Sequence, residues 1–524
     1  MIERILTVGG LTLLSRLTGF ARDIMLAALL GAGPVADAFF VALRLPNHFR
    51  AIFAEGAFNS AFVPAYARVR QQGGADQAAL FADRIFTLVL VTQVLLLVVA
   101  LLFTPGVITL LAPGFRGDPG RYALAVELTR ITFPYLMLVS LVTLYGGMLN
   151  AVGRFASPAA APILLNLSMM ATLALVVFFP SAGHAAAWGV FIAGCLEALL
   201  VAGDLKRQRL LPRLRWPKLD TDVTRFLKAF APATVGSAQT QIALFADTII
   251  ASFLAAGALS ALYYADRLNQ LPIGVIGIAV GTVLLPEMAN RIAGGDETGA
   301  RHAQNRAIEL TLLLTVPCLA AFLLVPDLIM LALFGRGAFT AADAQAAGAT
   351  LAAYATGLLP FVLMRSITTT FLARGDTTTP VIALFFAVLV NVALKILLMG
   401  RYAQVGLAIA TSVGAWINLA LLFWFAARRD LLGFDARLGR SVAKLAIAGL
   451  VLAVVLFFAQ RPVTELFAAW GPLRYVMPLL VLALLGAVIY GAAIALMFGR
   501  EWLKALRLRG ARKAAPPVVP PDQG

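Results

Sequence analysis

Seven charged side chains lie in one largely apolar stretch, Thr12 to Glu55, which is long enough for two membrane-spanning helices. A charged side chain at the centre of a bilayer costs roughly 2.5–3.5 kcal/mol on insertion scales. Such residues are therefore expected to pair with one another, to line a shared polar cavity, or to do both. The seven residues are Arg16, Arg22, Asp23, Asp37, Arg44, Arg50 and Glu55.

The spacing of these residues places several of them on shared helix faces. In the first span, the polar side chains fall within an arc of roughly 120°. In the second span, Asp37 and Arg44 are seven residues apart and lie on one face. Pro46 predicts a kink, so the face is not extended to Arg50 or Glu55. The polar face of the first span consists of Thr12, Ser15, Arg16, Gly19, Arg22 and Asp23.

Arginine is the residue type that indicates a ligand. Its planar guanidinium stays protonated and binds a phosphate group through two parallel hydrogen bonds. A later span adds Asp266 and Arg267. Several arginines without a lysine in these spans suit a diphosphate better than a cationic drug.

The rest of the chain must supply the helices that position this cluster. Of its 524 residues 61% are hydrophobic and 13% are charged, and the mean hydropathy is +0.89. These values, with repeated long apolar runs, predict an all-α polytopic membrane protein with about 14 spans. The expected spans are 5–30, 35–63, 85–112, 122–149, 158–180, 184–204, 225–254, 259–288, 307–334, 344–372, 379–399, 404–427, 441–459 and 474–498.

The loop charges predict the orientation of these spans. One side of the membrane receives most of the lysines and arginines, and by the positive-inside rule that side is cytoplasmic, together with both termini. This asymmetry explains most of the net charge of +16 without a nucleic-acid partner. Glu197 is expected near a membrane interface. The opposite side receives only Arg116, Arg121, Arg336, Arg401, Arg461 and Arg474.

An internal repeat at an offset of about 222 residues predicts two parallel halves of six spans each. It places Arg44 opposite Arg267 and Pro64 opposite Pro286. Parallel repeats with polar residues near the midplane are typical of transporters that work by alternating access. The expected parts are an N-lobe over 1–204, a cytoplasmic linker over 205–222, a C-lobe over 223–429, two added spans over 430–499 and a partly disordered tail over 500–524.

Three long motifs resemble those of the MurJ (MviN) family of lipid II flippases, within the multidrug/oligosaccharidyl-lipid/polysaccharide exporter superfamily. The resemblance implies translocation of an undecaprenyl-diphosphate-linked peptidoglycan precursor from the cytoplasmic to the periplasmic leaflet of the bacterial inner membrane. It also implies a lipid-tail groove formed by spans 13 and 14. The motifs are SRLTGFARD (15–23), GAGPVADAFFVALRLPNHFRAIFAEGAFNSAFVP (31–64) and YYADRLNQLPIGVIGIAVGTVLLPEMA (263–289).

The resemblance also assigns expected roles to the charged residues. Arg16, Arg22, Arg50 and Arg267 match the family's cavity arginines and are expected to bind the diphosphate. The expected cavity and gate residues are Asp23, Asp37, Arg44, Glu55 and Asp266.

Some family members have a sodium site, and here it is expected to be degenerate. Asp247, Asn391 and Thr411 match its positions, but Lys395 stands where a second carboxylate would be. The Lys395 ammonium is expected to pair with Asp247 and replace the cation. We therefore expect no metal and no cofactor, and the coupling ion stays open, with the membrane potential as an alternative driving force. Arg365 and Lys395 are intramembrane cations to which no role in transport is assigned.

Other functions fit the sequence less well. Another polyprenyl-diphosphate glycan remains open as substrate, whereas cavity arginines argue against a cation-coupled drug exporter. We expect no enzyme, since neither clustered carboxylates for a metal nor a histidine-containing nucleophilic site is found. The expected partners are lipid II and membrane lipids, and an association with the cell-wall synthesis machinery is left open.

Overall fold

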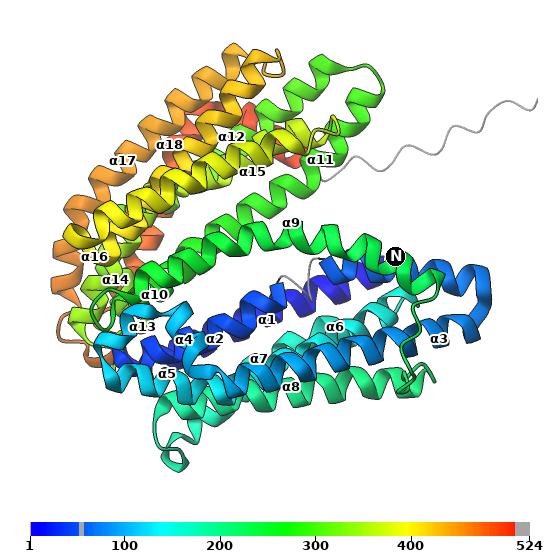
Figure 1. The fold of residues 1–524 in the computed structure, drawn as a ribbon. Helices are drawn as coiled ribbons and strands as arrows, with labels where there is room; N and C mark the ends of the chain where they lie inside the picture. The colour runs from blue at the N-terminus through cyan, green and yellow to red at the C-terminus, as the bar shows by residue number, and fades with distance from the viewer. Residues whose placement is uncertain (1, 52–56, 509–524) are drawn as a thin grey trace, which may run out of the picture. The chain divides into compact units, whose positions relative to one another are not determined.

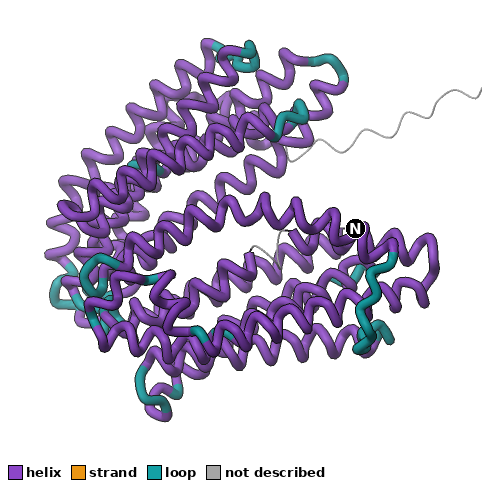
Figure 2. The backbone as a smooth tube through the Cα atoms, viewed as in Figure 1, coloured by secondary structure: helices purple, strands orange, loops and turns teal. Residues whose placement is uncertain are grey.

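The computed structural model describes residues 2–51 and 57–508, which form helices joined by short loops, without a strand in these ranges (Figures 1 and 2). The all-α prediction is thereby confirmed. The first helices are α1 (Ile2–Leu30), α2 (Pro34–Phe49), α3 (Ala57–Leu102), α4 (Thr104–Leu111), the 3₁₀ turn η2 (Pro113–Gly117), α5 (Pro119–Thr132), α6 (Pro134–Ala151), α7 (Ala156–Ala174), the 3₁₀ turn η3 (Val176–Phe178), α8 (Ala182–Arg207) and α9 (Thr221–Ser252).

The later helices include one π-helical turn, which often marks a functional position in a helix. In chain order they are α10 (Ala258–Pro272), the π turn η4 (Ile273–Gly277), α11 (Ile278–Ala293), α12 (Glu297–Leu324), α13 (Pro326–Phe334), α14 (Ala341–Ala355), α15 (Leu358–Leu372), α16 (Thr378–Arg428), α17 (Ala436–Leu466), the 3₁₀ turn η5 (Gly471–Leu473) and α18 (Val476–Leu508).

Ten helical segments of the described residues are long and apolar enough to cross a membrane. One of these segments, α16, holds two predicted spans, and a second, α3, joins the end of the predicted span 35–63 to most of the span 85–112. α16 has 51 residues and would be about 77 Å long if straight, yet Asp376 just before it pairs with Arg429 just after it. The chain reverses at Ala403, whose φ of 46° breaks the helix between the predicted spans 379–399 and 404–427. The count of 14 spans stays a prediction.

The second reversal lies in α3, where Gly74 adopts a φ of 78°. It brings the ring of Phe62 to 5.9 Å from that of Phe81, although the two are 19 positions apart. Phe226 of α9 packs on both rings, at 6.1 Å from Phe62 and 6.3 Å from Phe81. The start of α9 is therefore anchored to α3 by buried aromatic side chains.

The described chain forms two compact units, each assembled from separate segments. Unit 1 comprises Met1–Asn269, Met330–Tyr354 and Phe385–Gly414, and unit 2 comprises Gln270–Ile329, Ala355–Leu384 and Ala415–Gly524. The predicted lobe and linker boundaries at 204, 222 and 429 stay a prediction. The residues expected to bind substrate, to act as gates or to form the cation site lie in the described part of unit 1, except Glu55, which lies outside the described residues.

Three turns of unit 1 meet through close backbone contacts that require glycine. Gly31, Gly257 and Gly337 have φ values of 64°, 91° and 58°, a region that side-chain-bearing residues rarely adopt. A Cβ atom at Gly337 would lie 2.2 Å from the carbonyl oxygen of Ala28. The Ala338 N–H donates to that same oxygen at 2.7 Å. These contacts pack the turns before α2, α10 and α14 against one another.

Candidate functional site

Arg22 of α1 and Arg267 of α10 converge on one carboxylate, that of Asp23. Arg22 donates from Nε and Nη2 to Asp23 Oδ1 at 3.1 and 2.7 Å. The Nε of Arg267 lies 3.5 Å from Asp23 Oδ2. One acidic side chain therefore holds guanidinium groups from two helices that are far apart in the sequence, the predicted spans 1 and 8.

An amide on α7 fixes the orientation of the buried Arg22. Arg22 Nη1 donates to Asn166 Oδ1 at 3.0 Å, and Asn166 Nδ2 donates to the Ser15 carbonyl at 2.9 Å and to Thr18 Oγ1 at 3.1 Å. A Cβ atom on Gly19 would lie 3.4 Å from that amide, so glycine lets α7 approach α1 closely here. Asn166 thus links the Arg22 guanidinium to the backbone of α1, the helix that carries Arg22.

Tyr263 positions the second guanidinium. Arg267 Nη2 donates to the Tyr263 hydroxyl at 2.9 Å, and that hydroxyl donates to Asp23 Oδ1 at 3.2 Å. The Tyr263 ring stacks on Phe40 of α2 with centroids 3.8 Å apart, which restrains the ring. The Arg267 side chain is 43% exposed and that of Arg22 is 9% exposed. Arg267 is therefore the more accessible of the two to a ligand.

The other expected cavity residues differ in their surroundings. Arg16 is exposed on α1, whereas Arg50 is half-buried at the end of α2. Arg44 Nη1 donates to Thr248 Oγ1 of α9 at 2.8 Å. Asp266 is half-buried, and Glu55 lies outside the described residues. Arg22 and Arg267 thus share the Asp23 carboxylate, whereas Arg44 contacts α9.

Asp37 forms a second polar centre, fully buried at the start of α10. Its carboxylate accepts hydrogen bonds from the Gly257 N–H at 2.8 Å, the Ser260 N–H at 2.9 Å and the Ser260 hydroxyl at 2.5 Å. Arg121 Nη1 of α5 lies 3.2 Å from the same carboxylate. Gly257 has no side chain to cap α10, and Asp37 of α2 fills that role.

The region of the expected degenerate cation site contains an ion pair. The ammonium of Lys395 contacts Asp247 Oδ1, and the lysine side chain is 3% exposed. Asn391 packs against Gly414, and the Thr411 hydroxyl donates to the Leu407 carbonyl at 3.0 Å. Among the described residues, no group of three histidine, cysteine or acidic side chains is arranged to hold a metal.

Arg365 lies in unit 2, beside the π turn η4. Its Cγ would be 3.2 Å from a Cβ on Gly277, and the residue is exposed. No role in transport follows from this placement.

Three residues of these networks were not predicted from the sequence. Asn166 is an amide inside an apolar span, which is itself a signal of a buried partner. Arg121 was counted with the loop cations, yet it lies inside α5 and is 6% exposed. Glu197 was expected near a membrane interface, and its burial was not predicted: it is 2% exposed, is hydrogen-bonded to Tyr135 and interacts electrostatically with Arg50. Burial of the last two depends on helix rotation, which the sequence does not specify.

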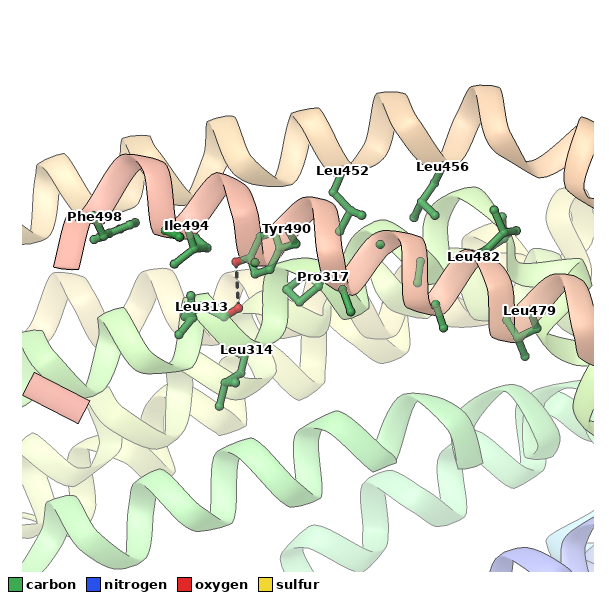
Figure 3. A pocket seen from close by; sticks show the side chains of 18 residues that line it. Leu313, Leu314, Pro317, Leu452, Leu456, Leu479, Leu482, Tyr490, Ile494 and Phe498 are labelled. Carbon is green, nitrogen blue, oxygen red and sulfur yellow. Dashed lines mark hydrogen bonds between the residues drawn. The ribbon is translucent and has the colours of Figure 1, made fainter. Parts of the chain in front are cut away.

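Unit 2 contains an apolar groove of about 570 Å³ between α12, α17 and α18 (Figure 3). Leu314, Leu452 and Leu482 are among the side chains that line it. Pro317 has no N–H to donate to the Leu313 carbonyl four residues earlier, and the Tyr490 hydroxyl donates to that oxygen at 2.9 Å instead. The groove is therefore apolar, and the Leu313 carbonyl, which Pro317 leaves without a helical donor, is still hydrogen-bonded. Its walls include the two helices predicted to follow the repeat.

A polytopic helical fold with paired arginines in a buried polar network is the kind of structure found in membrane transporters. The family model described as lipid II flippase MurJ matches residues 26–491. A probable lipid II flippase MurJ from Rhizobium meliloti is 42% identical over 465 residues, covering 88% of this chain and 86% of the relative. The chain belongs to the MurJ lipid II flippase family.

Solved structures agree on the fold. A lipid II flippase MurJ in an inward closed conformation superposes with a TM-score of 0.79 at 24% identity, covering 95% of this chain and 99% of that one. A multidrug resistance MATE family transporter of the MOP superfamily, in an inward-facing conformation, gives a TM-score of 0.61 at 14% identity, covering 81% and 97%. The chain thus shares the fold of both solved structures.

Proposed function

We propose that this protein moves lipid II from the cytoplasmic to the periplasmic leaflet by alternating access. Family membership supports the substrate, and the convergence of Arg22 and Arg267 on Asp23 is the observation that carries the mechanism. The head group of such a lipid carries a diphosphate and a sugar–peptide, which cannot cross hydrocarbon unaided because transfer of charge into the bilayer is too costly.

The diphosphate would bind by displacing the Asp23 carboxylate from the two guanidinium groups. Asp23 holds both guanidinium groups in place, so little side-chain entropy is lost when a ligand arrives. A diphosphate offers more acceptor oxygens and more charge than a carboxylate, and it competes for the same N–H donors. Arg267 is the more exposed member and makes the first contact in this proposal, and Arg22 follows once Asp23 is displaced.

The prenyl chain would occupy the apolar groove of unit 2. Each CH₂ group transferred to an apolar surface contributes about 0.8 kcal/mol, although a chain that leaves lipid gains far less than one that leaves water. The groove therefore serves to orient the lipid rather than to supply most of the affinity. A charged or bulky residue at Leu482 is expected to interfere with the tail without changing the arginine site.

The Lys395–Asp247 pair would replace an exchangeable coupling cation. A covalently attached ammonium already neutralises the carboxylate, so transport does not need a sodium ion at this position. The membrane potential acts on any net charge moved across the bilayer, at about 2.3 kcal/mol per elementary charge and 100 mV. It is the proposed source of free energy.

Asp37 would act as a gate residue. It joins α2 to the first turn of α10, and opening of the predicted periplasmic side requires these contacts to separate. The carboxylate would then lose three donors supplied by Gly257 and Ser260.

The test is a leaflet-accessibility assay of lipid II in cells depleted of the protein and complemented with variants. Arg22→Ala and Arg267→Ala are expected to abolish flipping while the protein still inserts. Arg401→Ala, at an exposed position outside both networks, is the control and should complement. Full flipping by both cavity variants contradicts the arginine mechanism. Flipping of a different polyprenyl-diphosphate glycan but not lipid II would contradict the substrate.

A further inference from the structure

The ion pair between Arg121 and Asp37 joins four elements at one corner of unit 1. Arg121 lies on α5 and Asp37 on α2, and both side chains are buried, with exposed fractions of 6% and 0%. Each of them also contacts the turn that connects α9 to α10, residues 253–257. The pair is therefore more than a local contact between α2 and α5.

Each member of the pair satisfies a different helix end. Asp37 accepts from the Gly257 and Ser260 N–H groups at the start of α10, where a helix carries partial positive charge. Arg121 Nη2 lies 3.5 Å from the Ser252 carbonyl and 3.4 Å from the Leu254 carbonyl, at the end of α9, where a helix carries partial negative charge. The two charges thus match the two helix ends of one turn.

The surroundings restrict Arg121 to this geometry. Its guanidinium lies over the Phe115 ring, 4.1 Å from the centroid, and Asp118 of the same corner is 3.9 Å from its Nε. The Gly114 N–H donates to Ser252 Oγ at 3.0 Å, and a Cβ on Gly114 would lie 2.4 Å from the Ser252 carbonyl oxygen. The η2 backbone and the end of α9 are therefore in direct contact beside the ion pair.

We propose that Arg121 is a positioning residue for the gate, acting through Asp37 to hold the α9–α10 turn against α2 and α5. The role in transport rests on the proposed function. The clamp, meaning the contacts of Arg121 and Asp37 with the α9–α10 turn, lies within unit 1 and does not depend on that function. Opening the clamp exposes one buried carboxylate and both helix ends at once, and so it is an all-or-none step. Removing the guanidinium alone leaves the buried Asp37 carboxylate without its counter-charge, which favours the open arrangement.

Electron paramagnetic resonance of spin labels on both sides of the Gly114–Ser252 contact tests this directly. The labels are attached to Gly117→Cys and Ala256→Cys, both exposed, with the native Cys195 and Cys318 changed to serine. The parent protein should show strong dipolar broadening from nearby labels. Arg121→Gln should remove this broadening from at least half of the molecules and reduce lipid II flipping about tenfold, a change of about 1.4 kcal/mol.

Three further variants and one control separate a positioning role from a general structural one. Arg121→Lys keeps the charge and should retain part of the broadening. Asp37→Asn should resemble Arg121→Gln, and the double variant Asp37→Asn with Arg121→Gln should add little to either, because both act in one clamp. The double variant also keeps the test available if the single one fails to fold. Arg116→Gln, at the same corner but exposed, is the matched control and should resemble the parent.

Unchanged broadening in Arg121→Gln, or an equal loss in Arg116→Gln, overturns the proposal. The resonance measurement needs no lipid II. A clamp that opens in Arg121→Gln while the parent protein does not flip lipid II would therefore contradict the proposed function and leave the clamp in place.

Discussion

In the proposed mechanism, the acidic residue Asp23 serves the binding of an anion. Without ligand it keeps Arg22 and Arg267 within reach of each other, with Asn166 and Tyr263 completing their hydrogen bonds. A charged group in an apolar span is costly unless it is paired in this way. The Asp23 carboxylate therefore occupies the arginines in place of the ligand, although its charge would repel a ligand bound beside it.

Arg22→Lys is expected to lower lipid II flipping about tenfold, while the protein still inserts into the membrane and elutes normally in size-exclusion chromatography. Lysine keeps the positive charge, but it cannot bond Asp23 and Asn166 at once in the fixed geometry that the planar guanidinium provides. The measurement is the leaflet-accessibility assay at matched expression. Wild-type flipping by this variant would show that charge alone is sufficient at this position.

Lys395→Met is expected to lower the Tm of the purified protein, because Asp247 loses its counter-charge. Breaking a fully buried pair costs about 3–5 kcal/mol, and since Asp247 is 33% exposed we expect about 2 kcal/mol here. The double variant Asp247→Asn with Lys395→Met should recover most of the loss. Replacing sodium with potassium in the buffer should leave both the Tm and the flipping activity of the parent protein unchanged. A Tm or a flipping rate that rises with sodium would contradict the proposal that the Lys395 ammonium replaces the cation.

At the scale of elements, the reversals and turns decide which helices meet. The break within α16 was predictable from the sequence, because long apolar runs on either side of it specify the spans 379–399 and 404–427, whereas the full set of 14 spans stays a prediction. The sequence also allowed prediction that Arg22 and Arg267 share a site, through the repeat and the motifs. Arg121 and Glu197 could not be placed, because their burial depends on how far α5 and α8 rotate about their own axes. Asn166, an amide in an apolar span, indicated a buried hydrogen-bond partner, but the sequence did not identify that partner as Arg22.

Gly337→Ala is expected to destabilise the packing of the three glycine turns. The new Cβ would clash with the Ala28 carbonyl at 2.2 Å, and a φ of 58° is strained for alanine, so we expect a loss of about 1–3 kcal/mol. The measurement is the Tm in detergent. Gly439→Ala is the matched control, since nothing lies within 4 Å of its Cβ and alanine favours the helix. Equal Tm values for the two variants would contradict the close approach.

Asp376 gives a pH-dependent prediction at the start of α16. Hydrogen bonds from the Thr379 hydroxyl and N–H, together with Arg429, lower the pKa of its carboxyl from 3.8 to about 2. A carboxyl whose pKa falls on folding stabilises the protein fully above the unfolded pKa, and this contribution is lost as the pH falls toward the folded pKa. The Tm difference between the parent and Asp376→Asn should therefore be constant near neutral pH and shrink between pH 3.8 and about 2. A difference that grows on acidification would contradict this assignment.

At the scale of the whole molecule, the distribution of lysine and arginine predicts the orientation in the membrane. The segment between α8 and α9 combines exposed apolar side chains with cations: Trp216 is 84% exposed and Leu214 is 69% exposed, beside Arg213 and Arg215. The side chain of Asp83 accepts from the Arg213 N–H at 2.7 Å and Thr87 Oγ1 from the Arg215 N–H at 3.0 Å, which holds this segment along α3. Such a composition suits the cytoplasmic surface of an anionic bilayer.

Cysteine labelling from one side of the membrane tests this orientation. Lys218→Cys in that segment and Ala469→Cys between α17 and α18 are both exposed, and Cys195 and Cys318 are first changed to serine. A membrane-impermeant maleimide added to intact spheroplasts should label Ala469→Cys and should reach Lys218→Cys only after permeabilisation, because translocating the cation-rich loops is unfavourable. The reverse pattern would invert the predicted topology. It would then place the Asp37–Arg121 clamp on the cytoplasmic side, so that its opening would admit substrate rather than release it.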